Sequence, residues 1–382
     1  MDDVPAGPAS PGPRRPMLSV VIPVHNGGSH FELCLRRLRD SHAADFELIV
    51  VDDGSTDGSA ALAEARGAVV VRNETPLGPA SARNTGAHLA TAPVVFFLDA
   101  DVAVHPETVE RVVARFESDP GLAALFGSYD DHPTAPGLVS QFRNLLHHYV
   151  HQQGEFVADA RPARTFWTGC GAIRRSVFLD LGGFDPRLYR RPAIEDIEFG
   201  YRLARAGFRT ILARDVQATH LKRWTLGNVI KTDVFQRGVP WMLLMKRSGI
   251  VETDLNVRAD QKLCVASAGL MSLAVLAAPA RPWLLAAVPL GLATILVLNG
   301  DFYRFLARRR GRVFAVGSVG LHYVYFCCCG VSVVIALALW HLSLRRTAAE
   351  PSGMRKDQPN GAAIPRPNTP ERARRPSRWT RP

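Results

Sequence analysis

The stretch VVFFLDADVAV, residues 94–104, joins a run of strand-forming residues to a pair of acids. Asp99 and Asp101 follow the apolar run directly and are separated by one alanine. An isolated D-x-D at this place can be a solvated strand end. The same two carboxylates can also hold a divalent metal together with the phosphates of a substrate. The rest of the chain has to decide between these two interpretations.

The first part of the chain alternates strands with helices. The pattern gives strand 18–24, helix 31–41, a strand within 46–59, helix 59–67, strand 68–72, helix 78–90 and strand 94–102. Such alternation predicts an α/β fold with a mostly parallel, doubly wound, Rossmann-like sheet. Ligands of such sheets bind at the carboxyl ends of the strands. These ends hold polar side chains, namely His25, Asp52, Asp53, Asp99 and Asp101, which favours the metal and phosphate site.

Two common phosphate-binding motifs are missing from the sequence. It contains no GxxxxGK[ST] motif, and no G-x-G-x-x-G follows the first predicted strand. Carboxylates at strand ends without a glycine-rich phosphate loop indicate that a metal binds the phosphates. Mg²⁺ or Mn²⁺ fits oxygen ligands of this kind.

Six segments in a fixed order resemble a known family. They are VVIPVHNG, VVDDGSTDGS, ARNTGA, FLDADV, TGCGAIRRSVFLDLGGFDPR and IEDIEFGYRLARAG, and together they resemble a family 2 glycosyltransferase with the GT-A fold over roughly residues 18–225. The resemblance implies transfer of a sugar from a nucleotide-sugar donor, for which a UDP-sugar is expected, to an acceptor with inversion at the anomeric carbon.

The resemblance also implies which residues bind the donor. Asp53 matches the acid that hydrogen-bonds the base, usually uracil, and Asp52 supports the strand end. Asp101 matches the metal ligand, whereas Asp99 meets the ribose or a metal-bound water and is a second candidate ligand. The remaining donor residues implied are Pro23, His25 and Asn26 in the first loop, with Arg83 and Asn84 after it. An ion pair of Arg83 with Asp99 or Asp53 is an equally good interpretation of that arginine.

Glu195 and Asp196 stand at the start of a predicted helix. Two acids at this place also suit the positive end of a helix without any catalytic role. In the resembled family the second acid of the pair removes the proton from the acceptor hydroxyl. Asp196 is therefore the expected general base, with Glu195 beside it.

Other residues are assigned to the acceptor and the leaving group. Trp167, Thr168 and Gly169 match the acceptor-side segment, although Trp167 could instead fill the core. His220 resembles a further metal ligand of some GT-A enzymes, and a packed core histidine is the alternative. Lys222 and Arg223 could stabilise the departing diphosphate or anchor the chain at a membrane. The histidines of a further predicted helix, His147, His148 and His151, are expected on a solvated face.

The part after residue 261 predicts membrane spans. Three apolar runs, 263–280, 283–300 and 313–342, are long enough to cross a bilayer. The loop 301–312 between the last two contains five arginines and one acid, which places it and the catalytic domain on the cytoplasmic side. The basic and apolar segment before the first run predicts interfacial helices, broken at Gly238–Pro240.

The domain boundaries follow from these patterns. We expect a disordered leader (1–16), a GT-A domain (17–226), interfacial helices (227–261), a transmembrane region (262–344) and a disordered basic tail (345–382). The tail carries ten Lys and Arg against three Asp and Glu, most of the formal net charge of +11, and it favours an anionic membrane surface over nucleic acid. The six cysteines show no paired spacing, so reduced thiols are expected.

The expected protein is thus a multi-pass membrane enzyme with a nucleotide-sugar donor and a membrane lipid or lipid-linked acceptor. Two alternatives stay open. A nucleotidyltransferase uses similar metal-binding acids, although HNGGSH lacks the basic residue of its usual loop. An inactive scaffold of the same fold is the other, although Asp101 and Asp196 are both present.

Overall fold

The computed structural model describes residues 16–42, 45–249 and 258–349, and side chains as far as Leu342. A first compact unit ends at Leu337, and a second begins at Ala338. The predicted leader lies outside the described residues except for Pro16. The predicted tail lies outside them from residue 350 on.

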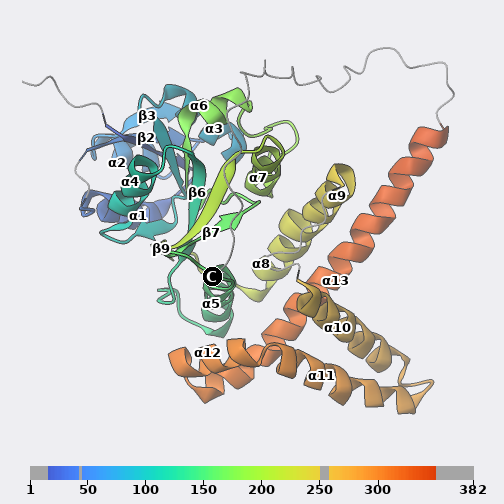
Figure 1. Ribbon diagram of the computed structural model, residues 1–382. Helices are drawn as coiled ribbons and strands as arrows, with labels where there is room; N and C mark the ends of the chain where they lie inside the picture. Colours follow the sequence, from blue (N-terminus) through green and yellow to red (C-terminus); the bar gives the residue numbers. More distant parts are fainter. Residues whose placement is uncertain (1–15, 43–44, 250–257, 350–382) are drawn as a thin grey trace, which may run out of the picture. The chain divides into compact units, whose positions relative to one another are not determined.

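A central sheet forms the core of the catalytic domain (Figure 1). In the described part of the chain it has nine strands in the order β3-β2-β1-β4-β8-β6-β9-β5, with β7 paired to β9. Strands β3, β2, β1 and β4 are parallel, β8 is antiparallel to both of its neighbours, and β6 is parallel to β9. The strands are β1 (Leu18–Val24), β2 (Phe46–Asp52), β3 (Val69–Arg72), β4 (Val94–Leu98), β5 (Val102–Val104), β6 (Leu122–Tyr129), β7 (Ala160–Ala163), β8 (Cys170–Arg174) and β9 (Arg209–His220).

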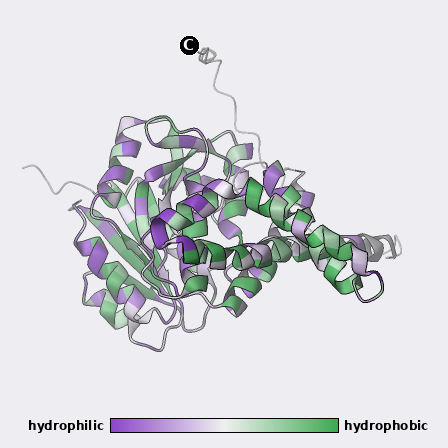
Figure 2. Ribbon diagram, turned by 90° about the horizontal axis from the view of Figure 1, so that it is seen from below, coloured by the Kyte–Doolittle hydropathy of each residue, from purple (hydrophilic) through white to green (hydrophobic). Residues whose placement is uncertain are grey.

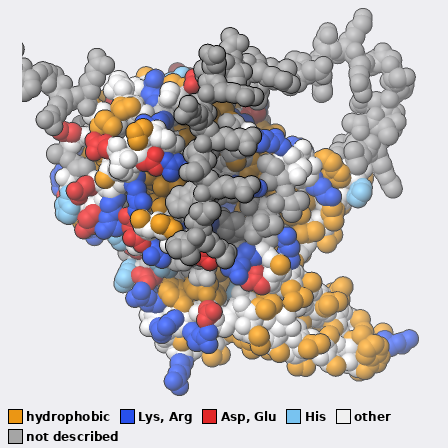
Figure 3. All heavy atoms as spheres, in the orientation of Figure 1, with side chains coloured by type: hydrophobic (Ala, Val, Ile, Leu, Met, Phe, Trp, Pro, Cys, Tyr) orange, Lys and Arg blue, Asp and Glu red, His pale blue; other side chains and the backbone are white. Residues whose placement is uncertain are grey.

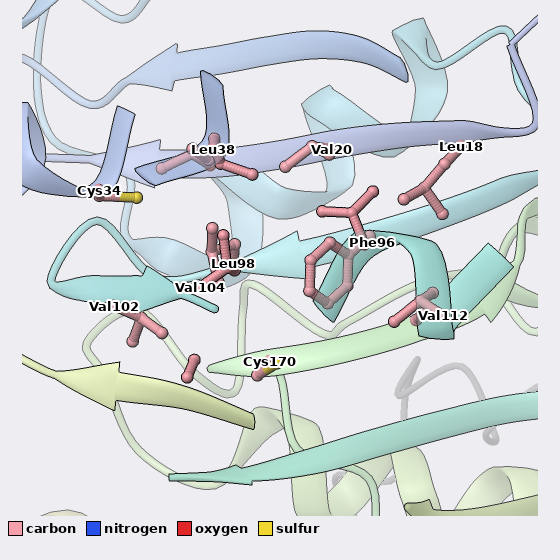
Figure 4. Packing of buried hydrophobic residues seen from close by; sticks show 14 of the residues in the cluster. Leu18, Val20, Cys34, Leu38, Phe96, Leu98, Val102, Val104, Val112 and Cys170 are labelled. Atoms are coloured by element: carbon pink, nitrogen blue, oxygen red, sulfur yellow. The ribbon is translucent and has the colours of Figure 1, made fainter. Parts of the chain in front are cut away.

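Helices cover both faces of this sheet, so its central strands are apolar on both sides. In β4, Val94, Phe96 and Leu98 face one hydrophobic cluster, whereas Val95 and Phe97 face another. The first cluster includes side chains of α1 (Gly28–Arg39), α2 (Ser59–Glu64) and α4 (Thr108–Ser118); Figure 4 shows its packing around Phe96. The second includes side chains of α3 (Pro79–Leu89), α6 (Arg175–Asp180) and α7 (Glu195–Arg205).

The expected single strand 94–102 is two strands with a turn between them. β4 ends at Leu98, and β5 starts at Val102 and pairs with β9 instead of continuing in the parallel sheet. The turn is fixed by backbone hydrogen bonds from Val102 N to Asp99 O (3.0 Å) and from Leu221 N to Asp101 O (2.9 Å). Both acids therefore lie in a tight turn, and Leu221, the residue that follows β9, is hydrogen-bonded to this turn.

A continuous helical run follows the sheet. It consists of α8 (Leu226–Lys231), a π-helix η1 (Thr232–Gly238) and α9 (Val239–Ser248). The expected break at Gly238–Pro240 is wrong, because Pro240 falls in the first turn of α9, where a missing N–H is tolerated. Trp241 and Leu244 of α9 pack on the second cluster of the catalytic domain, and Val239 packs on α13 (Arg312–Ala349).

Within the described residues, two helices are long and apolar enough to cross a membrane: α10 (Ala259–Ala277) and the part Arg312–Leu342 of α13. The segment between them is η3 (Pro282–Ala286) and α11 (Ala287–Leu298), which bends by 70° into α12 (Gly300–Arg310). Together the bent pair could form a third span by length and composition. Figure 2 colours the ribbon by residue hydropathy, and much of these helices is green, the colour of apolar residues. Helix α13 continues to Ala349, beyond the predicted start of the tail.

The arginine-rich segment 301–312 is mostly helix α12, and it attaches to the catalytic domain. Arg309 forms an ion pair with Asp131 at 2.5 Å, and Arg310 Nε donates to Gln141 Oε1 at 2.7 Å. Phe302 and Leu306 of α12 pack on α5 (Leu138–His151). The catalytic domain and this loop are therefore held together directly.

Candidate active site

A cavity of about 950 Å³ opens beside the Asp99–Asp101 turn. Chain segments far apart in the sequence form it, including the turn after β4, the start of α7 and the end of β9. It brings together nine of the predicted site residues: Arg83, Asp99, Asp101, Trp167, Thr168, Glu195, Asp196, His220 and Lys222. The predicted residues that do not line it are Pro23, His25, Asn26, Asp52, Asp53, Asn84, Gly169 and Arg223.

Arg83 joins two of the predicted acids. Its Nη2 lies 2.6 Å from Asp99 Oδ1, and its Nη1 lies 2.8 Å from Glu195 Oε1. The Arg83 side chain is 6% exposed, so these charges are removed from water and depend on one another. Arg83 thus has the ion pair with Asp99 that was one of its two predicted roles, and this pair leaves Asp99 less free than Asp101 to bind a metal.

Asp101 and His220 form the strongest candidate for a metal site. His220 Nε2 lies 3.6 Å from Asp101 Oδ2, and Asn144 Oδ1 accepts a hydrogen bond from His220 Nδ1 at 2.7 Å. The bond to Asn144 places a proton on Nδ1, and Nε2 faces the carboxylate. A proton on Nε2 gives an ion pair with Asp101, and without that proton the lone pair of Nε2 and the carboxylate can bind a metal cation. Burial would raise the pKa of Asp101, but His220, Lys222 and His30 lower it to about 2.

These two side chains alone do not complete a coordination shell. Within the described residues, no group of three or more His, Cys, Asp or Glu side chains is placed to hold a metal. Mg²⁺ and Mn²⁺ sites that bind phosphorylated substrates commonly use one or two protein ligands and take the rest from phosphate oxygens and water. Asp101 and His220 fit a metal of that kind.

Asp196 presents a carboxylate to the same cavity. Its Oδ2 lies 3.3 Å from Thr168 N and 3.4 Å from Thr168 Oγ1. Burial raises the pKa of Asp196 to about 6, with Glu195 adding to the rise and Arg83 opposing it. A carboxylate with such a pKa is suited to accept a proton near neutral pH.

Glu195 has a different environment from its neighbour. It is 4% exposed, and Oε1 binds Arg83 while Oε2 accepts the backbone N–H of Ala193 at 3.1 Å. Both oxygens are therefore used inside the protein. Asp196 differs in that it forms no ion pair within the described residues: its Oδ1 accepts the N–H of Ile197 at 2.8 Å, and its Oδ2 accepts the two longer bonds from Thr168.

Trp167 forms an aromatic wall of the cavity. Its ring contacts Tyr129, His147 and His151, with centroids 4.7, 5.0 and 5.4 Å away. The absence of a side chain at Gly169 leaves room for this ring, because a Cβ there would lie 2.4 Å from Trp167 Cζ2. Gly169 thus shapes the predicted acceptor segment without lining the cavity.

The expected solvated face of α5 is wrong. His148 and His151 are buried, and His147 and His151 line the cavity. Burial lowers the pKa of His147 well below its usual value and that of His151 to about 3, so both rings are neutral. Their helical spacing gave no sign of this, because α5 is covered by the sheet on one side and by α12 on the other.

The predicted nucleoside-binding residues form a separate group at the carboxyl ends of β1 and β2. Asp53 accepts hydrogen bonds from Asn73 Nδ2, Leu77 N and Gly78 N, each at 2.8 Å. His25 Nδ1 lies 2.8 Å from Asp53 O. Three further predicted residues belong here: Asp52, which accepts from Ser55 N, Asn26, which accepts from Thr56 N, and Pro23, which pairs with Val51 across the sheet.

The side chain of Asn84 forms hydrogen bonds within the protein. Its side chain donates to Phe184 O at 2.8 Å and accepts from Phe184 N at 2.9 Å. A carboxamide that satisfies both backbone groups of one residue fixes the turn before α7. The contact of Asn84 with the donor stays a prediction.

Lys222 and Arg223 are adjacent in the sequence, but their side chains have different surroundings. Lys222 lines the cavity, with Nζ 4.4 Å from the centre of the Trp224 ring. Arg223 is exposed and does not line the cavity. Only Lys222 is placed to meet a phosphate at this site.

Several cavity residues were not predicted from the sequence. They lie on α5, η1 and α9 and include Arg143, Asp233, Arg237 and Trp241. Gln236, Arg237 and Trp241 were visible as a polar and aromatic group in an amphipathic segment, the signal that could have pointed to them.

The catalytic domain is similar in sequence and in fold to glycosyltransferases. Residues 19–182 of this domain match the model of glycosyl transferase family 2. Its architecture is GT-A: a mannosyltransferase from Pyrobaculum calidifontis, solved in complex with GDP-Man and Mn²⁺, superposes with a TM-score of 0.54 and 19% identity, covering 84% of this chain and 88% of that one.

Curated relatives match the same region. Validoxylamine A glucosyltransferase from Streptomyces hygroscopicus subsp. jinggangensis is 31% identical over 239 residues, which is 54% of this chain and 56% of the relative. Glycosyltransferase AglE from Haloferax volcanii is 27% identical over 227 residues, 56% of this chain and 70% of AglE. The chain spans 52% to 64% of the length of three of the relatives that it matches.

Proposed function

We propose that the protein is a metal-dependent, inverting glycosyltransferase that moves a sugar from a nucleoside diphosphate sugar to a membrane-associated acceptor. One observation carries this proposal. The carboxylate of Asp196, with its pKa near 6, lines the same cavity as the Asp101–His220 pair. A proton acceptor and a phosphate-binding site in one cavity are the two requirements of sugar transfer to a hydroxyl group.

The donor would bind across the two groups of predicted residues. Asp53 and the first loop with His25 would hold the base, for which uracil is expected. Asp101 and His220, with Asp99 beside them, would hold Mg²⁺ or Mn²⁺, which supplies positive charge to the diphosphate. The solved Pyrobaculum mannosyltransferase contains Mn²⁺ with a nucleotide sugar, which supports this assignment. Lys222 lies beside this site and would add a second positive charge.

The transfer step follows from these positions. The acceptor hydroxyl gives its proton to Asp196 while its oxygen forms a bond to the anomeric carbon. The bond between that carbon and the diphosphate oxygen breaks, and the nucleoside diphosphate leaves with the electron pair. Lys222 stabilises the charge on the leaving diphosphate. Thr168 holds Asp196 in place through its N–H and hydroxyl groups.

The place of the reaction is proposed to be the cytoplasmic face of a membrane, with the chain crossing the bilayer more than once. Arg309 and Arg310 of the basic loop bind Asp131 and Gln141 of the catalytic domain. Positively charged loops stay on the cytoplasmic side. The loop and the domain attached to it would therefore share that side.

Membranes that contain the protein, incubated with nucleotide sugars, test this proposal. We expect Mn²⁺-dependent consumption of one donor with release of a nucleoside diphosphate. Asp196→Asn should abolish the transfer and leave Mn²⁺-dependent binding of the nucleotide unchanged. Near-full transfer by Asp196→Asn would overturn the assignment of the base. Release of pyrophosphate would instead identify a nucleotidyltransferase, and failure to bind Mn²⁺ and nucleotide would identify an inactive scaffold.

A further inference from the structure

The cavity does not end at the catalytic acids but continues between α9, α10 and α13. Its lining there is largely apolar and includes Met242, Met245, Val265, Phe326 and Val333. Two of these three helices are the ones long and apolar enough to cross a membrane. The cavity thus connects Asp196 directly with helices of the membrane region.

The outer surface of the same helices is also apolar. On α10, Leu270 and Leu273 are each 63% exposed, and on α13, Val334 is 67% exposed. Figure 3 shows apolar side chains gathered over the membrane helices. Since α10 contributes Val265 to the cavity and Leu273 to the outside, it separates the cavity from the region that a bilayer would fill.

Positive charge lies where the polar and apolar parts of the cavity meet. Arg237 of η1 lines the cavity and has no ion pair or hydrogen bond within the described residues. Lys246 and Lys262 line it farther toward the membrane helices. Asp233, the acid nearest in sequence, is already paired with Arg143 at 2.5 Å. This surplus of cations is suited to an anion that the protein itself does not supply.

We infer that the acceptor is a lipid in which a phosphate links a polyhydroxyl headgroup to an apolar chain. The chain lies between α9, α10 and α13, the phosphate binds Arg237, and the headgroup extends from there toward Asp196. One headgroup hydroxyl reaches Asp196 and receives the sugar, while the lipid phosphate is not consumed. This inference rests on the proposed function and adds the class of acceptor and its route from the membrane.

The π-helix supports this placement. Residues Thr232–Gly238 are wound as π-helix, and this winding sets the positions of Asp233 and Arg237 on the cavity side. Such segments are less stable than α-helix and occur frequently at functional sites. In an ordinary helix, residues four apart share one face, so the wider turn changes which side chains of α8 and α9 reach the cavity.

Binding of lipid without any donor tests the inference. The probes are phosphatidylinositol, diacylglycerol, inositol phosphate and a polyprenyl-diphosphate-linked sugar, each added to the full chain in detergent and counted by native mass spectrometry. We expect binding of one or both phosphate-containing lipids and weak binding of diacylglycerol and inositol phosphate. The two lipids distinguish a glycerolipid source of the headgroup from an isoprenoid source.

Two pairs of variants locate the site. Arg237→Gln should weaken the binding of the preferred lipid about tenfold or more, because a hydrogen bond to a charged group is lost. Arg247→Gln removes an exposed charge of α9 that does not line the cavity and should leave binding unchanged. Val265→Trp should fill the apolar part and reduce binding, whereas Leu273→Trp on the outer face of α10 should not.

The result separates the two proposals. Equal loss in Arg237→Gln and Arg247→Gln, or equal binding of diacylglycerol, would overturn the inference. Tight binding of inositol phosphate without a chain would overturn it as well. Hydrolysis of the nucleotide sugar in the absence of acceptor, which depends on Asp101, would still proceed in those cases and would leave the proposed function intact. Absence of that hydrolysis with normal lipid binding would count against the proposed function alone.

Discussion

Asn144 accepts a hydrogen bond from Nδ1 of His220 across 2.7 Å, and this bond turns Nε2 of the imidazole toward Asp101. The ring of Tyr129 lies flat on the same imidazole, with centroids 4.3 Å apart and planes 4° from parallel. A helix side chain and an aromatic ring thus fix both the tautomer and the orientation of His220. Contacts of this kind commonly hold a histidine in place for a metal.

Replacing Asn144 should weaken the binding of metal. Asn144→Leu removes the acceptor for Nδ1–H, so Nε2 is no longer held toward Asp101. We expect about 10- to 100-fold weaker Mn²⁺ binding, measured by electron paramagnetic resonance on the full chain. Asn144→Asp keeps an accepting oxygen and should retain most of the affinity. Unchanged Mn²⁺ affinity in Asn144→Leu would show that His220 does not bind metal through Nε2.

Transfer should depend on pH through Asp196. The pKa of this carboxyl is raised to about 6, chiefly by burial, and the base must be deprotonated to act. The rate under kcat/KM conditions should therefore rise with pH and level off above about 6. Asp196→Asn should lower the rate by a factor of about 10² to 10⁴. A profile that is flat between pH 5 and 7 at saturating Mn²⁺ would contradict the assignment.

The free energy of unfolding should also depend on pH through Asp196, but it should fall with rising pH where the rate rises. Because the native pKa of Asp196 is raised above the ordinary value of 3.8, the native state holds its proton more tightly than the unfolded state. This contribution to stability is present at low pH and is lost as pH rises through about 6. Asp196→Asn should thus raise the free energy of unfolding at pH 8 by on the order of 1 to 3 kcal/mol.

The control for this prediction is the same measurement at low pH. Near pH 4 the wild-type carboxyl of Asp196 is protonated in the native state, so the variant should gain little. Thermal unfolding in detergent at both pH values gives the comparison. A variant that is less stable than the wild type at pH 8 would indicate that Asp196 is a structural carboxylate and would contradict the raised pKa.

Arg83 should be essential for the stability of the site. Arg83→Met leaves Glu195, which is 4% exposed, without its cation. Loss of one partner of a buried ion pair costs about 3 to 5 kcal/mol. We expect a loss of that size in unfolding by denaturant. The double variant Arg83→Met with Glu195→Gln should recover part of the loss, and no recovery would show that the pair is not coupled.

Two glycines in the run α8–η1–α9 should behave differently. A Cβ on Gly238 would lie 2.2 Å from Ser332 Oγ of α13 and 2.6 Å from Asp233 O, so Gly238→Ala should destabilise the protein by about 1 to 3 kcal/mol. A Cβ on Gly227 meets nothing within 4 Å. Gly227→Ala in α8 should raise stability by about 0.4 to 1 kcal/mol. Equal effects of the two changes would mean that η1 and α13 do not meet at Gly238.

Part of the fold could be predicted because local patterns determine it. Strands such as Val94–Leu98 are buried on both faces, and their continuous apolar character gives the parallel part of the sheet. The split of the expected strand 94–102 depends on its pairing with β9, more than 100 residues later in the chain. A single sequence shows no sign of which distant strand takes over the pairing.

The candidate active site, too, could be predicted from the sequence only in part. Asp99, Asp101 and Asp196 could be named from ordered motifs, but the ion pair of Arg83 with Glu195 spans 112 positions. His147 and His151 pack on the ring of Trp167, and His148 stacks on Phe305 of α12, so segments far away in the chain determine their surroundings. Asn144 has no motif at all, because one hydrogen bond to His220 defines its place.

The shared wall of α9, α10 and α13 has a practical consequence for biochemistry. A shortened chain that stopped after Ser248 would keep every motif of the catalytic domain and still lose one side of its reaction chamber. Bulk water would then reach the donor from the open side. Such a fragment should consume nucleotide sugar by hydrolysis instead of passing the sugar on, so a soluble preparation would report the wrong reaction.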